Sequence, residues 1–213
     1  EIERMKKLGV EIRFNTAIGK DLTIDDLWRE GYRAIFISVG AHKSRRLGVE
    51  GENLNGVMQA LDFLRQLNSG KTIQIGEKVA IIGGGNVAVD TARTALRLGA
   101  KEVQILYRRS REEMPANPWE VKEAEDEGIK LHFLVVPKRI LGEDEQVQSI
   151  ECVKMELGEP DETGRRTPKP IEGSEFNMPI DTVILAIGET PDLLLLPKEV
   201  EIDRTNTIVA DPF

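Results

Sequence analysis

The chain has 213 residues, enough for one large domain or one and a half, and a formal net charge of −8. This negative charge argues against nucleic acid as a partner. The longest apolar runs are far shorter than a membrane span, and no signal peptide is visible. The single cysteine, Cys152, excludes an internal disulfide, a C-x-x-C redox pair and a cysteine-ligated cluster within these residues. A reducing cytoplasm is therefore the simplest setting.

The first 52 residues predict short elements that do not form a domain by themselves. Expected here are a helix end at Glu1–Leu8, strands at Glu11–Phe14 and Ala34–Val39, and a helix at Ile24–Glu30. The chain begins inside the first of these helices, without an initiator Met, and its last residues, 207–213, stop just after a strand-like run. We therefore expect it to be part of a longer polypeptide.

Residues 78–109 carry the most informative pattern, which reads KVAIIGGGNVAVDTARTALRLGAKEVQILYRR. After a helix expected at Met58–Asn68, the pattern predicts a buried parallel strand at Val79–Ile82, a glycine turn, a helix over 86–98 and a strand at 103–107. A glycine turn before a helix N-terminus lets a pyrophosphate approach the backbone amides. The predicted phosphate-binding residues are Gly83, Gly84, Gly85, Asn86 and Val87.

The spacing of this turn matches a known dinucleotide-binding pattern. Gly83, Gly85 and Ala88 fit the form G-x-G-x-x-[G/A], in which the third position only has to be small. The strand and the helix stand in the required order around it, which makes the motif more specific than the glycines alone. The alternative is a glycine turn in an α/β protein that binds no nucleotide.

The end of the second strand indicates which dinucleotide is bound. An NAD site usually has Asp or Glu about 20 residues after the glycines, to bond the ribose 2′-hydroxyl. Here Arg108 and Arg109 follow Tyr107 instead, and guanidinium groups match the oxygens of a 2′-phosphate. We therefore predict NADP(H), held by Arg108 and Arg109. The alternative is a solvated cluster of surface arginines.

The rest of the chain predicts an antiparallel insert beside the parallel sheet. A Glu-rich helix at Glu120–Glu127 is followed by expected strands at 130–136, 147–157 and 171–178, and by a last apolar strand at 182–187 that leads to Gly188. Residues 160–170, PDETGRRTPKP, read as the exposed tip of a hairpin, and we assign its Arg165 and Arg166 no role.

Three segments together resemble a known family of flavoproteins. The run IIGGGNVAVDTARTALRLGAKEVQILYRRSREEMPA is similar to the NADPH-binding domain of the glutamate synthase small (β) subunit and its relatives. AIFISVGA at 34–41 resembles the "ATG" segment of these proteins, although Val39 stands where Thr is usual. AIGETPD at 186–192 resembles their second such segment.

The resemblance implies a fold and a division of the chain. The expected fold is α/β: a Rossmann-like, three-layer dinucleotide-binding domain with a parallel sheet and an antiparallel β insert, plus a partial remnant of an FAD domain. Residues 1–52 would be the FAD-domain remnant and linker, 53–192 the NADP(H)-binding domain, and 193–213 a return segment toward the FAD domain.

The resemblance also implies a function. In the intact protein hydride would pass from NADPH to FAD, and electrons would go on to a large glutamate synthase-like subunit or another acceptor. The family's FAD-binding glycine motif and its iron–sulfur clusters lie N-terminal to the residues seen here. We therefore expect an incomplete FAD site that does not hold FAD stably, and no turnover by this chain alone. Ala186, Ile187 and Gly188 would border the path of the nicotinamide.

No catalytic side chain and no metal ligand is predicted. Hydride chemistry belongs to the cofactors, and the protein supplies binding and orientation. His42 and His132 lack the neighbouring Cys or acidic residues of a metal site. A noncatalytic NADP(H)-binding or NADP(H)-sensing module remains the alternative to an enzyme.

Overall fold

The computed structural model describes residues 1–161, 164–204 and 206–210, and these residues form two compact units. One unit is residues 44–189; the other combines 1–43 with the described part of 190–213. The predicted hairpin tip at 160–170 includes residues 162 and 163, and the predicted return segment 193–213 includes 205 and 211–213. These six residues lie outside the described residues.

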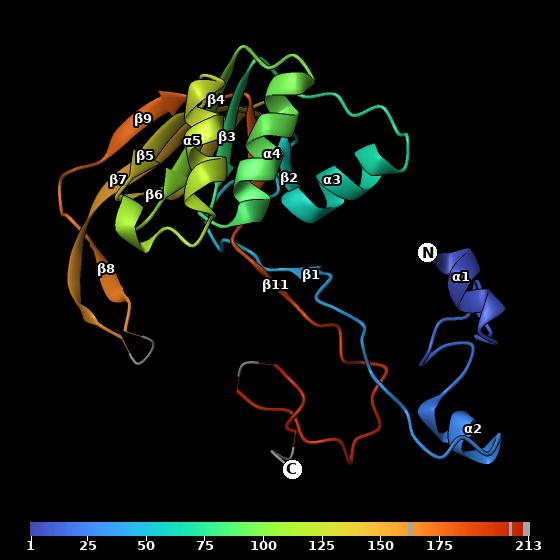
Figure 1. Cartoon of the computed structure of the whole chain (residues 1–213). Helices are drawn as coiled ribbons and strands as arrows, with labels where there is room; N and C mark the ends of the chain where they lie inside the picture. The colour runs from blue at the N-terminus through green and yellow to red at the C-terminus, as the bar shows by residue number, and fades with distance from the viewer. Residues whose placement is uncertain (162–163, 205, 211–213) are drawn as a thin grey trace. The chain divides into compact units, whose positions relative to one another are not determined.

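A parallel sheet forms the centre of the unit 44–189 (Figure 1). Its strands, in spatial order, are β2 (Val57–Gln59), β10 (Thr182–Leu185), β3 (Lys78–Ile82), β4 (Glu102–Tyr107) and β5 (Lys130–Phe133). The chain runs outward from β3 through β4 to β5 and then returns to place β10 on the other side of β3. The strand order therefore reverses at β3 and β10, where open α/β sheets bind their ligands.

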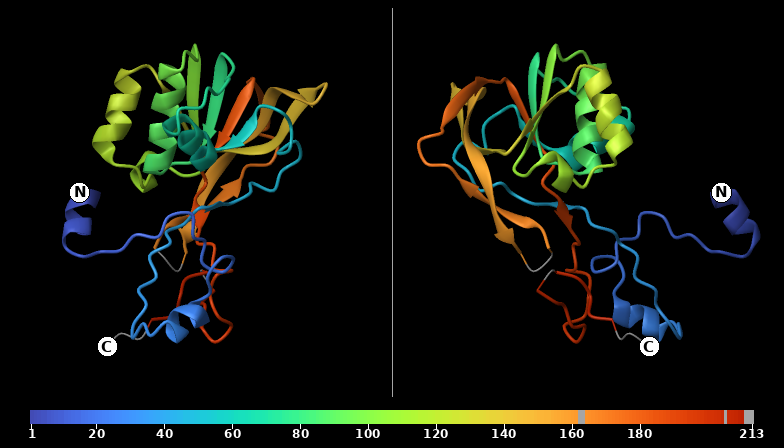
Figure 2. Two further views of the ribbon diagram at one scale, coloured as in Figure 1. Left: turned by 90° about the vertical axis from the view of Figure 1, so that its right-hand side faces the viewer. Right: turned by 60° about the vertical axis from the view of Figure 1, so that its left-hand side comes forward.

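Three helices cover one face of this sheet (Figure 2). They are α3 (Ala60–Asn68), α4 (Asn86–Arg97) and α5 (Pro118–Asp126). Helix α4 buries Ala88, Val89, Ala92 and Ala95, a stripe with helical spacing, against Val79, Ile81 and Ile105 of the sheet. Because most of this stripe is alanine, the helix can approach the strands closely, which positions its N-terminus at the end of β3.

An antiparallel sheet covers the other face, so the unit has three layers (Figure 2). Its strands are β6 (Val135–Glu143), β7 (Gln146–Pro160), β8 (Arg166–Pro170) and β9 (Phe176–Pro179). Ile140, Ile150 and Cys152 pack in one cluster with residues of β3 and β10. The β6–β7 turn has positive φ at Asp144 and Glu145, as two-residue hairpins prefer. The predicted fold class and its antiparallel insert are confirmed.

Two predicted strands in this region are each divided in the structure. The run 130–136 contains both β5 and the start of β6, because at Leu134, with φ 55°, the chain leaves the parallel sheet for the antiparallel one. The run 171–178 begins as a turn around Gly173, and only its end forms β9. The predicted helix at 58–68 begins two residues late, because Val57–Gln59 pairs with β10.

The unit that combines 1–43 with the described part of 190–213 contains two of the predicted helices. These are α1 (Ile2–Lys7) and α2 (Ile24–Arg29), and Thr23 and Asp26 form a capping box on α2. The strands predicted at 11–14 and 34–39 are not formed. A strand needs a neighbouring ladder of backbone hydrogen bonds, and none of the described residues pairs with these two segments.

The chain passes between the two units at two short paired strands, β1 (Lys43–Ser44) and β11 (Glu189–Thr190). None of the helices in the described part of the chain is long and apolar enough to cross a membrane.

Candidate functional site

The first two glycines of the turn are required by the fold. A Cβ on Gly83, whose φ is +148°, would lie 2.1 Å from the carbonyl oxygen of Ala186 at the end of β10. A Cβ on Gly84 would lie 2.4 Å from the ring of Tyr107. Both glycines therefore let the ends of three neighbouring strands meet the turn without a clash.

Gly85 is different, because the fold itself does not require a glycine there. It is the N-cap of α4 with φ −89°, an ordinary value, and a Cβ built on it would meet nothing within 4 Å. The Ala88 amide donates to the carbonyl of Gly85, whereas the amides of Gly85, Asn86 and Val87 donate to none of the residues that the structure describes. The free volume, the unpaired amides and the helix dipole together fit a pyrophosphate.

The next two predicted residues serve the surrounding structure as well. The Asn86 side chain is exposed, and its Oδ1 accepts a hydrogen bond of 2.9 Å from the amide of Asn117. Val87 is half-buried and packs against the helix-side core. The backbone amides of this pair, in the first turn of α4, donate to none of the described residues.

A loop that the sequence did not single out, residues 110–117, is tied to the glycine turn. The hydroxyl of Tyr107 donates to the carbonyl of Glu113 at 2.8 Å. The amide of Ala116 donates to the carbonyl of Gly84 at 3.0 Å, and Asn117 reaches Asn86 as described. The loop thus forms a strap from the end of β4 back to the start of α4. Pro115 and Ser110 mark it as a loop in the sequence, but its anchor points depend on the tertiary fold.

The two predicted arginines occupy different environments. Arg108 is exposed and forms no hydrogen bond or ion pair with any residue that the structure describes. Arg109 is only 7% exposed; its Nε donates to the carbonyl of Arg166 at 2.8 Å, and its Nη2 lies 3.3 Å from Asp161. Arg109 therefore fastens the β7–β8 hairpin to the end of β4, while Arg108 is left available for an anion.

Arg166, to which the sequence assigned no role, belongs to the same cluster. Its backbone amide and its Nε both donate to Oε1 of Glu113 at 3.1 Å, and its Nη2 lies 3.5 Å from Oγ of Ser110. Burial works to raise the pKa of Glu113, but the hydrogen bonds from Arg166 and Ser110 outweigh it and leave that pKa below its usual value. Glu113 is thus ionised near neutral pH. No sequence signal links residues 113 and 166, since only the folded hairpin brings them together.

The predicted nicotinamide border lies at the end of β10. Ala186 is buried beside Gly83, and its amide donates to the carbonyl of Ile82 at 2.8 Å. Gly188 has φ +100°, and a Cβ there would meet nothing within 4 Å. Ile187 is half-buried against the antiparallel layer. The structure therefore brings Ala186 and the glycine turn together on two adjacent parallel strands.

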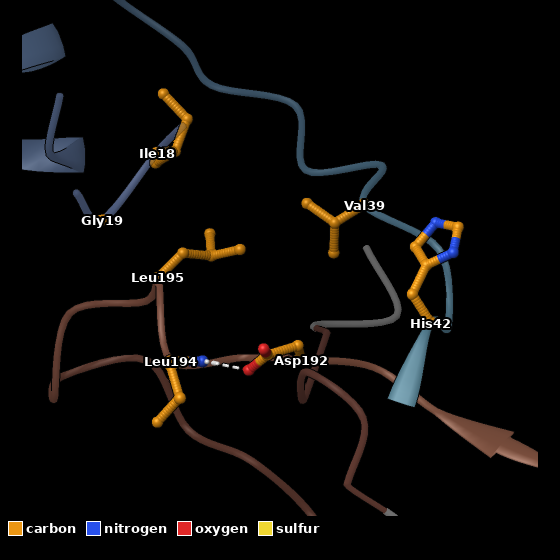
Figure 3. A pocket seen from close by; sticks show the side chains of 7 residues that line it. All are labelled: Ile18, Gly19, Val39, His42, Asp192, Leu194 and Leu195. Carbon is orange, nitrogen blue, oxygen red and sulfur yellow. Dashed lines mark hydrogen bonds between the residues drawn. The ribbon is translucent and has the colours of Figure 1, made fainter. Parts of the chain in front are cut away.

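A pocket of about 270 Å³ lies within the unit of residues 1–43 and 190–210 (Figure 3). It is lined by Ile18, Gly19, Val39, His42, Asp192, Leu194 and Leu195. Val39 and Asp192 come from the two segments that resemble flavoprotein motifs, and a carboxylate oxygen of Asp192 accepts a bond from the Leu194 amide. The volume is below the range of about 300–1,000 Å³ typical of ligand sites, so it would not enclose a dinucleotide.

Redox or metal chemistry has no side-chain candidate in the parts of the chain that the structure describes. Cys152 is buried, and burial raises the pKa of its thiol to about 12. Among residues 1–161, 164–204 and 206–210, no group of three or more His, Cys, Asp or Glu side chains is placed to hold a metal ion.

Comparison with characterised proteins places the chain among oxidoreductases. It is 48% identical to the NADPH-Fe(3+) oxidoreductase subunit beta of Geobacter sulfurreducens, over 98% of this chain and 32% of that protein. It is 48% identical to the NADP(+)-dependent formate dehydrogenase subunit beta of Moorella thermoacetica, over 100% of this chain and 30% of that protein. It is 38% identical to the glutamate synthase [NADPH] small chain of Escherichia coli, over 95% of this chain and 46% of that protein.

A solved structure of the Mycobacterium tuberculosis oxidoreductase FprA has the same fold. Its TM-score is 0.78 at 22% identity, over 99% of this chain and 62% of FprA. The chain spans about a third to a half of the length of the curated relatives named above. The model of the pyridine nucleotide-disulphide oxidoreductase family matches residues 4–213. The resemblance to glutamate synthase small subunits is confirmed, and the chain belongs to the pyridine nucleotide-disulphide oxidoreductase family.

Proposed function

We propose that residues 53–192 bind NADP(H) and deliver its hydride to FAD in a flavin-dependent oxidoreductase. The observation that carries this proposal is Gly85, where the fold needs no glycine and leaves open space at a helix N-terminus. Relatives named for NADPH or NADP(+) support the choice of nucleotide, and so does the absence of a carboxylate at the end of β4.

The residues of the chain have separate tasks in this proposal. The amides of Gly85, Asn86 and Val87 bind the pyrophosphate, and the dipole of α4 favours its negative charge. Arg108 binds the 2′-phosphate. The strand end Ala186–Gly188 directs the nicotinamide half along the reversal of strand order between β3 and β10. The bound nucleotide and flavin supply the hydride chemistry, so no acid–base side chain is needed from these residues.

The partner is proposed from the names of the relatives. Two of them are beta subunits and one is a small chain, which supports a second subunit as the electron acceptor. A large glutamate synthase-like subunit is one such acceptor.

The proposal is tested by anaerobic reduction of the purified protein in its natural length. We expect a flavin absorbance band that NADPH bleaches, and we expect NADH to bleach it much less at the same concentration. A protein that binds NADPH, carries no flavin and leaves the nucleotide unoxidised would instead be a noncatalytic NADP(H)-binding module, and would contradict the proposal.

A further inference from the structure

Arg166 reaches the candidate nucleotide site from a distant part of the chain. It begins β8, in the antiparallel insert, and its side chain is 47% exposed. Its contacts with Glu113 and Ser110 place its guanidinium beside the loop that follows β4. Ser110 comes three residues after Tyr107, at the position where the 2′ substituent of the ribose is expected.

Glu113 orients this guanidinium without using all of its donors. A guanidinium carries five N–H groups in a fixed plane, and Glu113 binds the one on Nε. The edge formed by the two Nη atoms is left toward the Ser110 hydroxyl, at the weak distance of 3.5 Å. This edge has the two-pronged geometry that binds phosphate oxygens. The Ser110 hydroxyl beside it donates to Oε2 of Glu113 at 3.3 Å, and its rotation would direct the same proton to a bound anion.

The backbone of the hairpin holds Arg166 in place independently of its side chain. The carbonyl of Arg166 accepts from Nε of the buried Arg109, and its amide donates to Glu113. Both contacts use backbone atoms at position 166, so truncating the side chain leaves the hairpin attached.

We propose that Arg166 is a further specificity-determining residue, which binds the 2′-phosphate of NADP(H) together with Arg108 and Ser110. This inference rests on the proposed function of the site. The antiparallel insert is then part of the nucleotide site as well as a cover for the sheet. Glu113 offsets the charge of Arg166, so Arg108 supplies the uncompensated positive charge and Arg166 supplies the directed pair of donors. NADH has a hydroxyl in place of the phosphate and gains little from either arginine.

The test compares Arg166→Ala with Arg165→Ala in the purified protein in its natural length. Arg165 is the matched control: it is adjacent, exposed and equally charged, and its side chain has no partner among the described residues. Nicotinamide fluorescence gives the affinities for NADPH and NADH. We expect Arg166→Ala to weaken NADPH binding about tenfold and to leave NADH binding within about twofold. Arg165→Ala should change neither affinity by more than about twofold.

Two further measurements make the result decisive. Arg166→Lys keeps the charge but loses the planar pair of donors, so we expect it to fall between the wild type and Arg166→Ala. Competition by 2′,5′-ADP should weaken in Arg166→Ala, while competition by 5′-AMP should not. If Arg166→Ala lowers the affinities for NADPH and NADH equally, or lowers neither, the inference is wrong even though the site binds nucleotide. A wild-type protein that binds neither nucleotide would contradict the proposed function itself.

Discussion

Gly85 differs from the two glycines before it, because the packing of the fold requires a glycine at 83 and 84 but not at 85. Gly83 and Gly84 face backbone or ring atoms at 2.1 and 2.4 Å from a built Cβ, so replacing either one disturbs the packing of the strand ends. Gly85 has a φ that any residue adopts and open space around it. A side chain there would fill only the open volume in which we propose that the pyrophosphate binds.

We expect Gly85→Val to fold with a melting temperature close to that of the wild type and to lose NADPH binding. Gly85→Ala should show the same loss in smaller degree, because its side chain is smaller. Gly84→Ala is the contrasting variant, and its clash with Tyr107 should lower the melting temperature. Thermal unfolding and nicotinamide fluorescence give the two readouts. A Gly85→Val protein with unchanged NADPH affinity would show that the phosphate binds elsewhere.

The adjacent arginines should respond to substitution in opposite ways. Arg108→Ala removes an exposed charge with no partner among the described residues, so we expect unchanged stability and a loss of NADPH affinity of roughly ten- to a hundredfold. Arg109→Ala removes a buried side chain that holds the hairpin, and it should lower the free energy of unfolding by about 1–3 kcal/mol. Denaturant unfolding and nucleotide titration distinguish the two. Equal effects of both substitutions on stability would show that Arg108 is structural as well.

At the scale of elements, the two faces of the parallel sheet are covered by layers of different kinds. The helical layer buries an alanine-rich stripe and brings α4 close to β3. The antiparallel layer packs Ile150 and Cys152 of β7 in one cluster with Ala80 and Val183. The hairpin that continues from this layer brings Arg166 to Glu113 and Ser110, so in our proposal the insert contributes both to core packing and to nucleotide specificity.

Cys152 reports on the packing of the antiparallel layer. With a pKa of about 12, about one thiol in ten thousand is ionised at pH 8, compared with about a quarter in an unfolded chain. Its side chain is also fully buried. We expect a thiol reagent at pH 8 to label it only as fast as the layer opens, and to label it rapidly in urea. Labelling of the native protein at the rate of a free thiol would mean that β7 does not pack on the sheet as described.

At the scale of the molecule, local patterns predicted what depends on local sequence. The run Val79–Ile82 and the glycine turn identified β3 and the start of α4. Both features depend on residues that are adjacent in the sequence: an apolar run forms the buried strand, and the glycines that follow form the turn. The antiparallel insert was predicted by successive strands without helices between them. The division at Leu134 was missed, since the side-chain pattern continues while the backbone changes sheets.

The parts of the site that the sequence did not predict all depend on distant partners. Arg108 and Arg109 look alike in the sequence, and only the β7–β8 hairpin distinguishes them by burying one. The segment 34–39 is apolar and β-branched, yet it forms no strand and Phe36 is 92% exposed. A strand also needs a neighbouring strand with which to pair, and none of the described residues pairs with this segment. Pairing of this kind is not encoded in the spacing of side chains.

Hydrogen exchange of the backbone amides, measured with and without nucleotide, tests the central claim most directly. The account predicts that NADPH slows exchange in peptides that cover 83–90 and 108–117. NADH at matched saturation should slow exchange in the first peptide and have less effect on the second, because it lacks the 2′-phosphate. Saturating NADPH that leaves exchange at 83–90 unchanged would contradict the placement of the dinucleotide at this turn.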